Sequence, residues 1–206
     1  FMNNPDEETA VREFGTGDKY FAVVTLLATL PGLPMFGHGQ IEGLAEKYGM
    51  EFRRPYWDEE ADEALVARHE REIFPLLRRR ELFASAANFR LFDLRDADGT
   101  VNEGVFVYTN GQDDDRVLVV VNNSYEHAAG TISQSAEYVD GESTRSQSIG
   151  ETLAASDRDD EYLIMQEQRS GLWYLRSSRE VTRNGLHLTV DGYQSTVFWG
   201  IHRRAD

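Results

Sequence analysis

The chain of 206 residues contains no cysteine. This absence excludes disulfides, thiolate metal sites and cysteine nucleophiles, and it leaves the redox environment of the protein undetermined. Lysine is nearly missing too, since only Lys19 and Lys47 among the 21 basic residues are lysines. Long hydrophobic runs are also missing. The longest run, Phe21–Leu30, is interrupted by threonine and is far too short to cross a bilayer, so we expect no membrane association.

Acidic residues clearly outnumber basic residues in this chain. The 36 acidic residues against 21 basic ones give a formal net charge of −15. A surface of that sign repels nucleic-acid phosphates and anionic membranes, so we expect neither as a partner. Hydrophobic residues make up 40% of the chain and charged residues 28%, which is typical of a globular protein with a real core.

The composition changes near residue 85. All five prolines lie within the first 75 residues, and helical periodicity is confined to the same part. Short β-rich runs take over afterwards. We place a boundary between Leu82 and Asn88, which gives two expected domains, residues 1–85 and 86–206.

Residues 1–85 alternate between helical and buried-strand patterns. We expect a helix that Asp18 caps and Pro31-Gly32 ends. A buried strand is expected at Leu33–Phe36, and a second helix over Glu59–Arg80, which Pro75 should kink or split. This order of strand end, helix, strand, loop and helix is typical of successive βα units in a parallel sheet or barrel.

Residues 86–206 show short strand patterns separated by turn signals such as Asn110-Gly111 and Asp191-Gly192. This pattern predicts an antiparallel β-sandwich. The polar stretch Asp140–Glu161 is interpreted as a long mobile loop. The expected strands are Phe89–Leu94, Val105–Thr109, Val117–Asn122, Thr131–Gln134, Tyr162–Gln166, Trp173–Arg176, Leu186–Val190 and Ser195–Ile201.

Candidate site residues stand at two expected strand ends. Asn4 and Asp6 lie within the first seven residues of the chain, at one expected strand end. His38 and Gln40 follow the expected strand at Leu33–Phe36. Reactive groups of a parallel barrel gather at such C-terminal strand ends, and the glycines beside His38 allow close backbone approach to a ligand. The Asp113-Asp114-Asp115 run lacks EF-hand spacing and the histidines lack ligand spacing, so we expect no metal and no cofactor.

The two motifs resemble a known family. Phe1-Met2-Asn3-Asn4-Pro5-Asp6 resembles the Phe-x-x-Asn-His-Asp motif at the end of the seventh barrel strand in the alpha-amylase family of glycoside hydrolases and transglycosylases. Pro31 to Gln40 resembles the eighth-strand motif of that family, in the matching order and spacing. Residues 86–206 look like its domain C. The resemblance implies the last βα units of a (β/α)8 barrel followed by an antiparallel β-sandwich.

The resemblance also implies an activity, a retaining mechanism on α-glucans or maltooligosaccharides. Asp6 matches the carboxylate that stabilises the oxocarbenium-like transition state. Asn4, His38 and Gln40 would contact the substrate. The nucleophile and the acid/base of this family sit on earlier strands, so we expect a C-terminal fragment that is inactive alone and needs the missing N-terminal barrel portion as its partner. Apolar faces left uncovered would favour self-association.

Other interpretations remain open at this stage. Pro5 stands where the family has histidine, which removes a hydrogen-bond donor to the sugar and permits a degenerate relative of the enzyme. Asp6-Glu7-Glu8 suits the first turn of a helix that begins at Asp6. His38 suits a loop cap, and His69 a packed position on a helix. A non-catalytic carbohydrate-binding or interaction module, with the β-rich part as the functional unit, is the alternative from another class.

Overall fold

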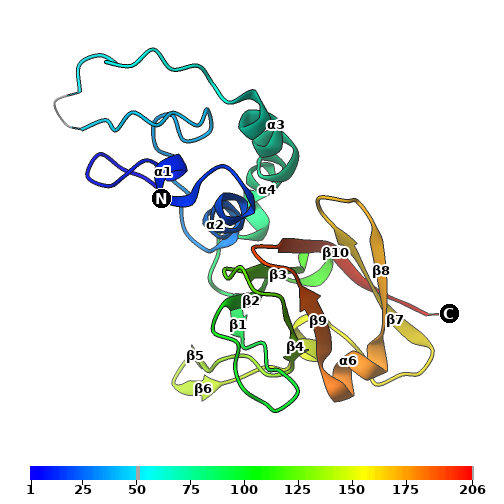
Figure 1. Cartoon of the computed structure of the whole chain (residues 1–206). Helices are drawn as coiled ribbons and strands as arrows, with labels where there is room; N and C mark the ends of the chain where they lie inside the picture. The colour runs from blue at the N-terminus through cyan, green and yellow to red at the C-terminus, as the bar shows by residue number, and fades with distance from the viewer. Residues whose placement is uncertain (50–51, 206) are drawn as a thin grey trace.

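The computed structural model describes residues 1–49 and 52–205. Helices and long connections occupy its N-terminal part, and strands dominate from Arg90 onward. Figure 1 shows the helices α1 to α4 stacked on one side of the strand-rich part, with the N-terminus among the loops beyond them. Within the described residues, no helix is long and apolar enough to span a bilayer.

The helical part contains α1 (Ala10–Phe14), α2 (Asp18–Thr29), α3 (Glu63–Glu72), α4 (Phe74–Arg78) and the 3₁₀ turn η1 (Arg80–Leu82). Asp62 caps α3 by accepting hydrogen bonds from the N–H groups of Ala64 and Leu65. Pro75 lies in the first turn of α4, where its missing N–H costs nothing, so the expected long helix is split there as predicted. Asp18 lies in the first turn of α2, whose N-cap is Gly17.

The strand predicted at Leu33–Phe36 is wrong. In the described residues before Arg90 the chain forms no strand, although the helices of the expected βα units are present. The physical reason is the lack of neighbours. A parallel strand needs pairing partners and cover on both faces, whereas here the side chains of Leu33 and Met35 are 86% and 57% exposed.

The strand-rich part is mainly antiparallel, as predicted. A six-stranded sheet has the order β1-β2-β3-β10-β7-β8, and β4 pairs with β9 and β5 with β6 in separate ladders. The strands are β1 (Arg90–Phe92), β2 (Val105–Asn110), β3 (Val117–Asn122), β4 (Ala128–Ile132), β5 (Tyr138–Asp140), β6 (Ser143–Arg145), β7 (Glu161–Glu167), β8 (Trp173–Ser177), β9 (Leu186–Val190) and β10 (Ser195–Ala205).

The interpretation of Asp140–Glu161 as a long mobile loop is wrong. This stretch contains β6 and the short helix α5 (Ile149–Thr152), and the side chains of Ile149 and Leu153 are fully buried. Ser148 and Glu151 form a reciprocal capping box at the start of α5. A second helix, α6 (Ser178–Asn184), was not expected. Ser177 caps it by accepting from the N–H of Glu180.

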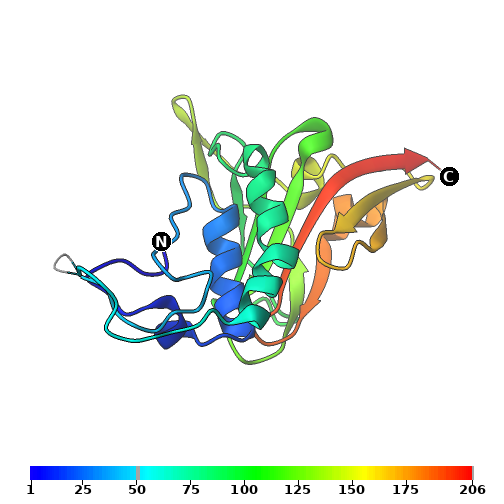
Figure 2. The same ribbon diagram turned by 90° about the horizontal axis from the view of Figure 1, so that it is seen from above.

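Strand β3 separates two apolar cores. Val117, Val119 and Val121 face the helices, while Leu118 and Val120 face the layer that contains β4, β9, α5 and α6. Figure 2 shows α2 and the α3–α4 pair lying across one face of the sheet. Because both faces of β3 are covered, all six of its residues are buried.

Two buried asparagines hydrogen-bond at opposite ends of the β2–β3 ladder. Asn110 donates through Nδ2 to the carbonyls of Phe83 and Ser85 at 3.2 and 2.8 Å. Asn122 donates to the carbonyls of Glu126 and Asp191 at 2.7 and 3.0 Å. The first asparagine therefore ties the sheet to the helical part, and the second ties it to the turns at its other end.

A buried carboxylate links α3 to the turn between β7 and β8. The side chain of Glu72 is 5% exposed, and its oxygens accept from Arg68 and Arg71 at 2.9 Å and from Arg169 at 3.1 Å. Arg68 also pairs with Asp18 at 2.6 Å. Arg169 belongs to the strand-rich part, so this cluster joins the two parts of the chain electrostatically.

Replacing Glu72 with alanine should destabilise the protein strongly. The change removes the carboxylate that three guanidinium groups share, and losing charge-assisted hydrogen bonds to one buried acceptor costs about 1–3 kcal/mol, since Arg68 keeps Asp18 and Arg71 stays exposed. The unfolding free energy, measured by urea denaturation, checks this. The matched control is Glu70→Ala on the exposed side of the same helix. Equal losses in the two variants would contradict the role of Glu72.

Candidate functional site

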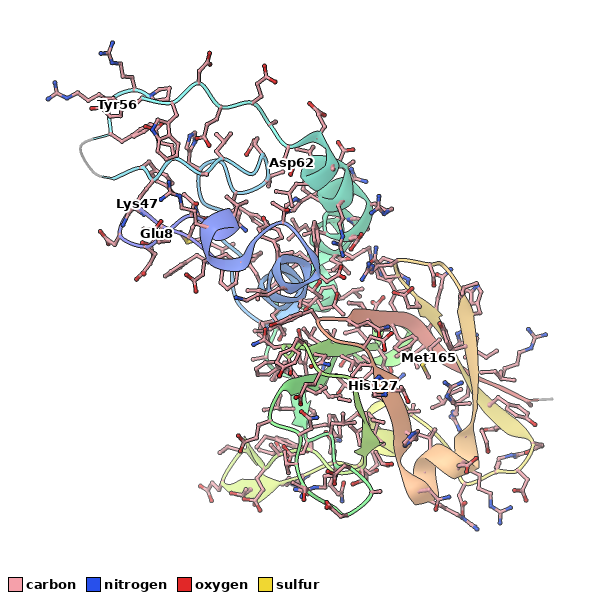
Figure 3. The ribbon with its side chains drawn as sticks, viewed as in Figure 1. Glu8, Lys47, Tyr56, Asp62, His127 and Met165 are labelled. Atoms are coloured by element: carbon pink, nitrogen blue, oxygen red, sulfur yellow. The ribbon has the colours of Figure 1, made fainter. Side chains whose placement is uncertain are left out.

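The N-terminal segment, residues 1–9, lies against the connection after α2. Gln40 donates through Nε2 to the sulfur of Met2 at 3.3 Å, and the Nζ of Lys47 donates to the carbonyl of Asp6 at 3.0 Å. Asn3 is buried beside Gly37, where an added Cβ would lie 2.4 Å from Asn3 Oδ1. Figure 3 shows Lys47 next to Glu8 at this corner. The two sequence motifs are therefore brought side by side.

Asp6 is exposed and stands in a turn that Asn4 builds. The Oδ1 of Asn4 accepts from the N–H groups of Asp6 and Glu7 at 2.7 and 3.0 Å, which is an Asx-type turn. Helix α1 begins only at Ala10. The interpretation of Asp6 as a first-turn acid of a helix is therefore wrong, and Asn4 positions the backbone of Asp6 with its side chain.

His38 lies on an aromatic loop beside that corner. Its N–H donates to the hydroxyl of Tyr48 at 3.2 Å, and its ring packs edge-on against Tyr48 with centroids 5.4 Å apart. Phe52 completes the group at 6.3 Å from both rings. A cavity of about 310 Å³ opens here and is lined by His38, Leu44, Glu46, Phe52, Pro55, Trp57, Asp58 and Glu59.

Two carboxylates brace the loop around this cavity. Glu59 accepts from the N–H groups of Ala45 and Glu46 at 2.7 and 2.9 Å. Glu46 accepts in turn from the N–H groups of Tyr56 and Trp57. The loop is thus held by charge-assisted hydrogen bonds in place of regular secondary structure, and sequence patterns gave no sign of these pairings.

Gln40 is buried beneath the corner. Besides its contact with Met2, its Oε1 accepts from the N–H of Gly37 at 3.1 Å, and its side chain is almost fully inaccessible. Both ends of the amide are therefore used within the protein. Gln40 supports the backbone at Gly37, and any effect on a ligand would pass through that backbone.

Below Gln40 lies a buried network that sequence reasoning only partly anticipated. Tyr20 donates its hydroxyl hydrogen toward the carbonyl of Gln40 at 2.8 Å and lies 3.1 Å from Nε2 of His69. Nδ1 of His69 donates to the carbonyl of Leu65 at 3.0 Å. The prediction that His69 is a packed residue is confirmed, whereas the sequence pattern gave no sign of its polar contact with Tyr20.

Burial shapes the protonation of this network. Desolvation lowers the pKa of His69 below 6.5, although the Leu65 carbonyl and the charges of Glu42 and Glu72 oppose part of that shift. Desolvation likewise raises the pKa of Tyr20 above its ordinary value of 10.0. Both groups are therefore neutral near pH 7, which fits a structural role in positioning Gln40.

The aromatic residues of the loop differ in exposure. Tyr48 fixes the His38 backbone, so it pins the loop, whereas Tyr56 and Trp57 are 78% and 47% exposed. The guanidinium of Arg12 lies 5.2 Å from the Trp57 ring centroid. In the described part of the chain, no group of three His, Asp or Glu side chains is arranged to hold a metal ion.

A larger groove of about 830 Å³ lies elsewhere, between the end of α3 and strands β8, β9 and β10. Arg71, Arg169, Arg176 and His187 line it, but none of the four predicted site residues does. Two of these arginines are already paired with Glu72. We therefore assign the candidate site to the corner formed by the N-terminal segment and the braced loop.

Comparisons with known proteins agree with the resemblance in fold. No protein-family model and no curated protein matches the chain. Among solved structures, a maltogenic alpha-amylase from Thermotoga neapolitana matches with a TM-score of 0.56 at 15% identity, covering 96% of this chain and 40% of that one. The alpha-amylase from Geobacillus thermoleovorans, solved with acarbose, gives 0.51 at 16%, covering 95% and 33%.

A debranching enzyme from Nostoc punctiforme matches with a TM-score of 0.56 at 11% identity, covering 96% of this chain and 34% of that one. At these identities the matches show the fold alone. The chain therefore has the fold of part of alpha-amylase family enzymes, and it spans between 33% and 40% of the length of these three structures.

Gly37→Ala tests the contact between the two motifs. The added methyl group would overlap the buried Asn3 side chain, so we expect a loss of about 1–3 kcal/mol and release of the N-terminal segment. Chemical denaturation and limited proteolysis near residue 6 measure the two effects. Gly17→Ala is the control because no atom lies within 4 Å of its added Cβ. Intact protection from protease in Gly37→Ala would contradict the contact.

The pH dependence of stability tests the burial of His69. With a lowered pKa in the folded state, the unfolded chain binds more protons below pH 6.5, so the unfolding free energy should fall as pH decreases from that value. It should be fully retained above pH 6.5. His69→Gln should flatten this dependence between pH 7 and 5 relative to the wild type. Parallel curves for wild type and His69→Gln would contradict the assignment.

Proposed function

We propose that these residues belong to an alpha-amylase-type glycoside hydrolase or transglycosylase that acts on α-glucans by a retaining mechanism. The observation that carries the proposal is the corner itself, where both motif segments meet beside a cavity in a chain with the matching fold. The nucleophile and the acid/base would come from chain outside residues 1–206, so we propose that this chain alone is inactive.

Asp6 would act as the carboxylate that stabilises the transition state. Positive charge develops on the sugar ring as the glycosidic bond breaks, and a fixed negative group nearby favours that state over the ground state. The Asx turn of Asn4 and the bond from Lys47 to the Asp6 carbonyl fix its backbone. An electrostatic group that is oriented in advance needs no reorganisation during the reaction.

The remaining site residues would take supporting roles. His38 faces the cavity and would contribute an imidazole to substrate contacts beside the exposed ring of Trp57. Asn4 would act on substrate through Asp6, because its Oδ1 is occupied by the turn. Gln40 would hold the backbone at Gly37. Pro5 has no side-chain hydrogen-bond donor, although the alpha-amylase family has a histidine at that position. His38 on the adjacent loop would take over the role of that histidine.

The proposal also gives a reason why Leu33–Phe36 forms no strand here. In the complete enzyme this segment would pair with neighbouring barrel strands, which would cover the exposed side chains of Leu33 and Met35. Most of α2 is already buried against the sheet and the other helices. Any self-association driven by uncovered barrel surface would therefore involve residues 33–36 more than α2.

Asp6→Asn in the product of the complete coding sequence tests the proposal. Loss of the charge should lower kcat/KM on maltoheptaose by about 10²–10³-fold, as expected for one lost electrostatic group in a transition state. The protein fold should be unaffected because Asp6 is exposed. Proton NMR of the first-formed product should show retention of the α-anomer.

Glu7→Gln is the matched control, since Glu7 is an exposed acid one residue away in the same turn. Its kcat/KM should stay near that of the wild type. The proposal fails if Asp6→Asn and Glu7→Gln are equally active. An inactive complete protein would favour a degenerate relative, and tight binding of maltooligosaccharide with no turnover would favour a carbohydrate-binding module.

A further inference from the structure

Strand β8 ends the six-stranded sheet in the described part of the chain. The hydrogen-bond pattern tells which of its backbone groups are free. The N–H of Glu167 donates to the carbonyl of Leu172 at 2.8 Å, so that carbonyl points toward β7, whereas the N–H of Leu172 donates to the Oγ of Ser170. These directions alternate along a strand. The backbone N–H and C=O groups of Trp173 and Leu175 therefore point to the open edge. The N–H of Ser177 does so too, but its carbonyl belongs to the first turn of α6, of which Ser177 is the N-cap.

A side-chain contact supports this assignment. The carbonyl of Leu175 accepts from the guanidinium of its exposed neighbour Arg176 at 2.9 Å, which requires that carbonyl to lie away from β7. A hydrogen bond to a neighbouring strand would satisfy the same carbonyl more completely, because it would also satisfy the N–H of Leu175.

The side chains at this edge are apolar and exposed. Trp173 and Leu175 project from the sheet face opposite the core and are 57% and 55% exposed. The Trp173 ring lies over Gly200, and its centroid is 6.3 Å from that of His202. Leu175 is paired with Ile164 of β7. An exposed apolar edge strand is the usual template for pairing with another strand.

We propose that β8 pairs antiparallel with β8 of a second copy of this chain, about a two-fold axis at Leu175. The axis places Leu175 opposite Leu175 of the second copy and Trp173 opposite Ser177. The two Leu175 residues exchange two hydrogen bonds. The N–H of each Ser177 donates to the carbonyl of Trp173 in the other copy, while the Ser177 carbonyl stays in the first turn of α6. The two six-stranded sheets then form one continuous sheet with isologous contacts.

The side chains suit this register as well. On the outer face, the two Leu175 side chains meet between the two Trp173 rings and form one apolar stripe. On the inner face, Tyr174 stands opposite Arg176 of the second copy, which allows a cation–π contact and sets no like charges against each other. A two-fold axis at Tyr174 or Arg176 is excluded, because the backbone groups of these residues already bond β7. An axis at Arg176 would also place two guanidinium groups opposite each other.

The absence of cysteine permits a direct test of the register. Leu175→Cys should form an intermolecular disulfide under mild oxidation, because residues opposite each other in a hydrogen-bonded pair have Cα atoms about 5.5 Å apart. Trp173→Cys should not, because residue 173 of the two copies would be offset by four residues, about 13 Å. Val139→Cys, on the exposed β5–β6 hairpin, measures random collision.

The expected result is a dimer that forms at least roughly tenfold faster for Leu175→Cys than for either control. Equal rates for all three variants would overturn the proposal. Faster cross-linking of Trp173→Cys than of Leu175→Cys would also overturn it, since that outcome demands another register or another partner surface.

Sedimentation of the unmodified 206-residue chain gives an independent test. Leu175→Arg should raise the dimer dissociation constant by at least about tenfold, because two charges would face each other at the axis. Leu33→Arg is the control, since Leu33 is an exposed leucine in the helical part. A monomeric wild type at all concentrations would overturn the proposal, as would a dimer that only Leu33→Arg dissolves.

Discussion

The enclosure of β3 on both faces is the constraint on which the rest of the structure depends. Its apolar side chains alternate between a core shared with α2 and α4 and a core shared with β4, β9 and the short helices α5 and α6. Neither layer can be removed without exposing half of that strand. The helices therefore form a layer that packs on one face of the sheet. This packing fixes the position of the candidate site.

A chain of polar contacts runs from this packing to the candidate corner. Thr29 at the end of α2 shares a hydrogen bond of 2.6 Å with the hydroxyl of Tyr108 on β2, and Tyr20 near its start reaches the Gln40 carbonyl. Helix α2 is thus fixed to the sheet at one end and to the loop of His38 at the other. The exposed site residues stand on a buried and neutral polar support, which suits a site whose geometry must be held.

The sequence allowed the strands to be predicted better than the helical part. β3 and β9 have the predicted bounds, because short runs of aliphatic and β-branched residues between turn residues leave few alternatives. Leu33–Phe36 was mistaken for a strand because an apolar run does not reveal whether pairing partners exist. The helices α5 and α6 were missed although Ser148 and Glu151 form a capping-box pair, since so few apolar residues surround them.

The candidate site could be predicted only in part from the sequence, for a related reason. The motifs identified Asp6 and His38, and the fold agrees with the family resemblance that the motifs suggested. The contacts that hold them come from residues such as Glu46, Glu59 and Lys47, which are ordinary surface types in the sequence. Long-range hydrogen bonds to loop backbone leave no periodic signal, so only the structure shows them.

The two-sided burial of β3 has a consequence for how its alignment is chosen. A shift by one residue would exchange Val119 and Val120 between the cores and would change hydrophobic burial very little. Hydrophobic burial alone therefore hardly distinguishes between the possible alignments of this strand. Asn122 selects one alignment, because a shift of β3 in either direction would pull its buried amide from its two carbonyl partners. Asn110 in turn fixes the neighbouring strand β2 to the helical part. In this sheet the apolar residues stabilise the packing, and the side-chain amides of Asn110 and Asn122 determine how the strands are aligned.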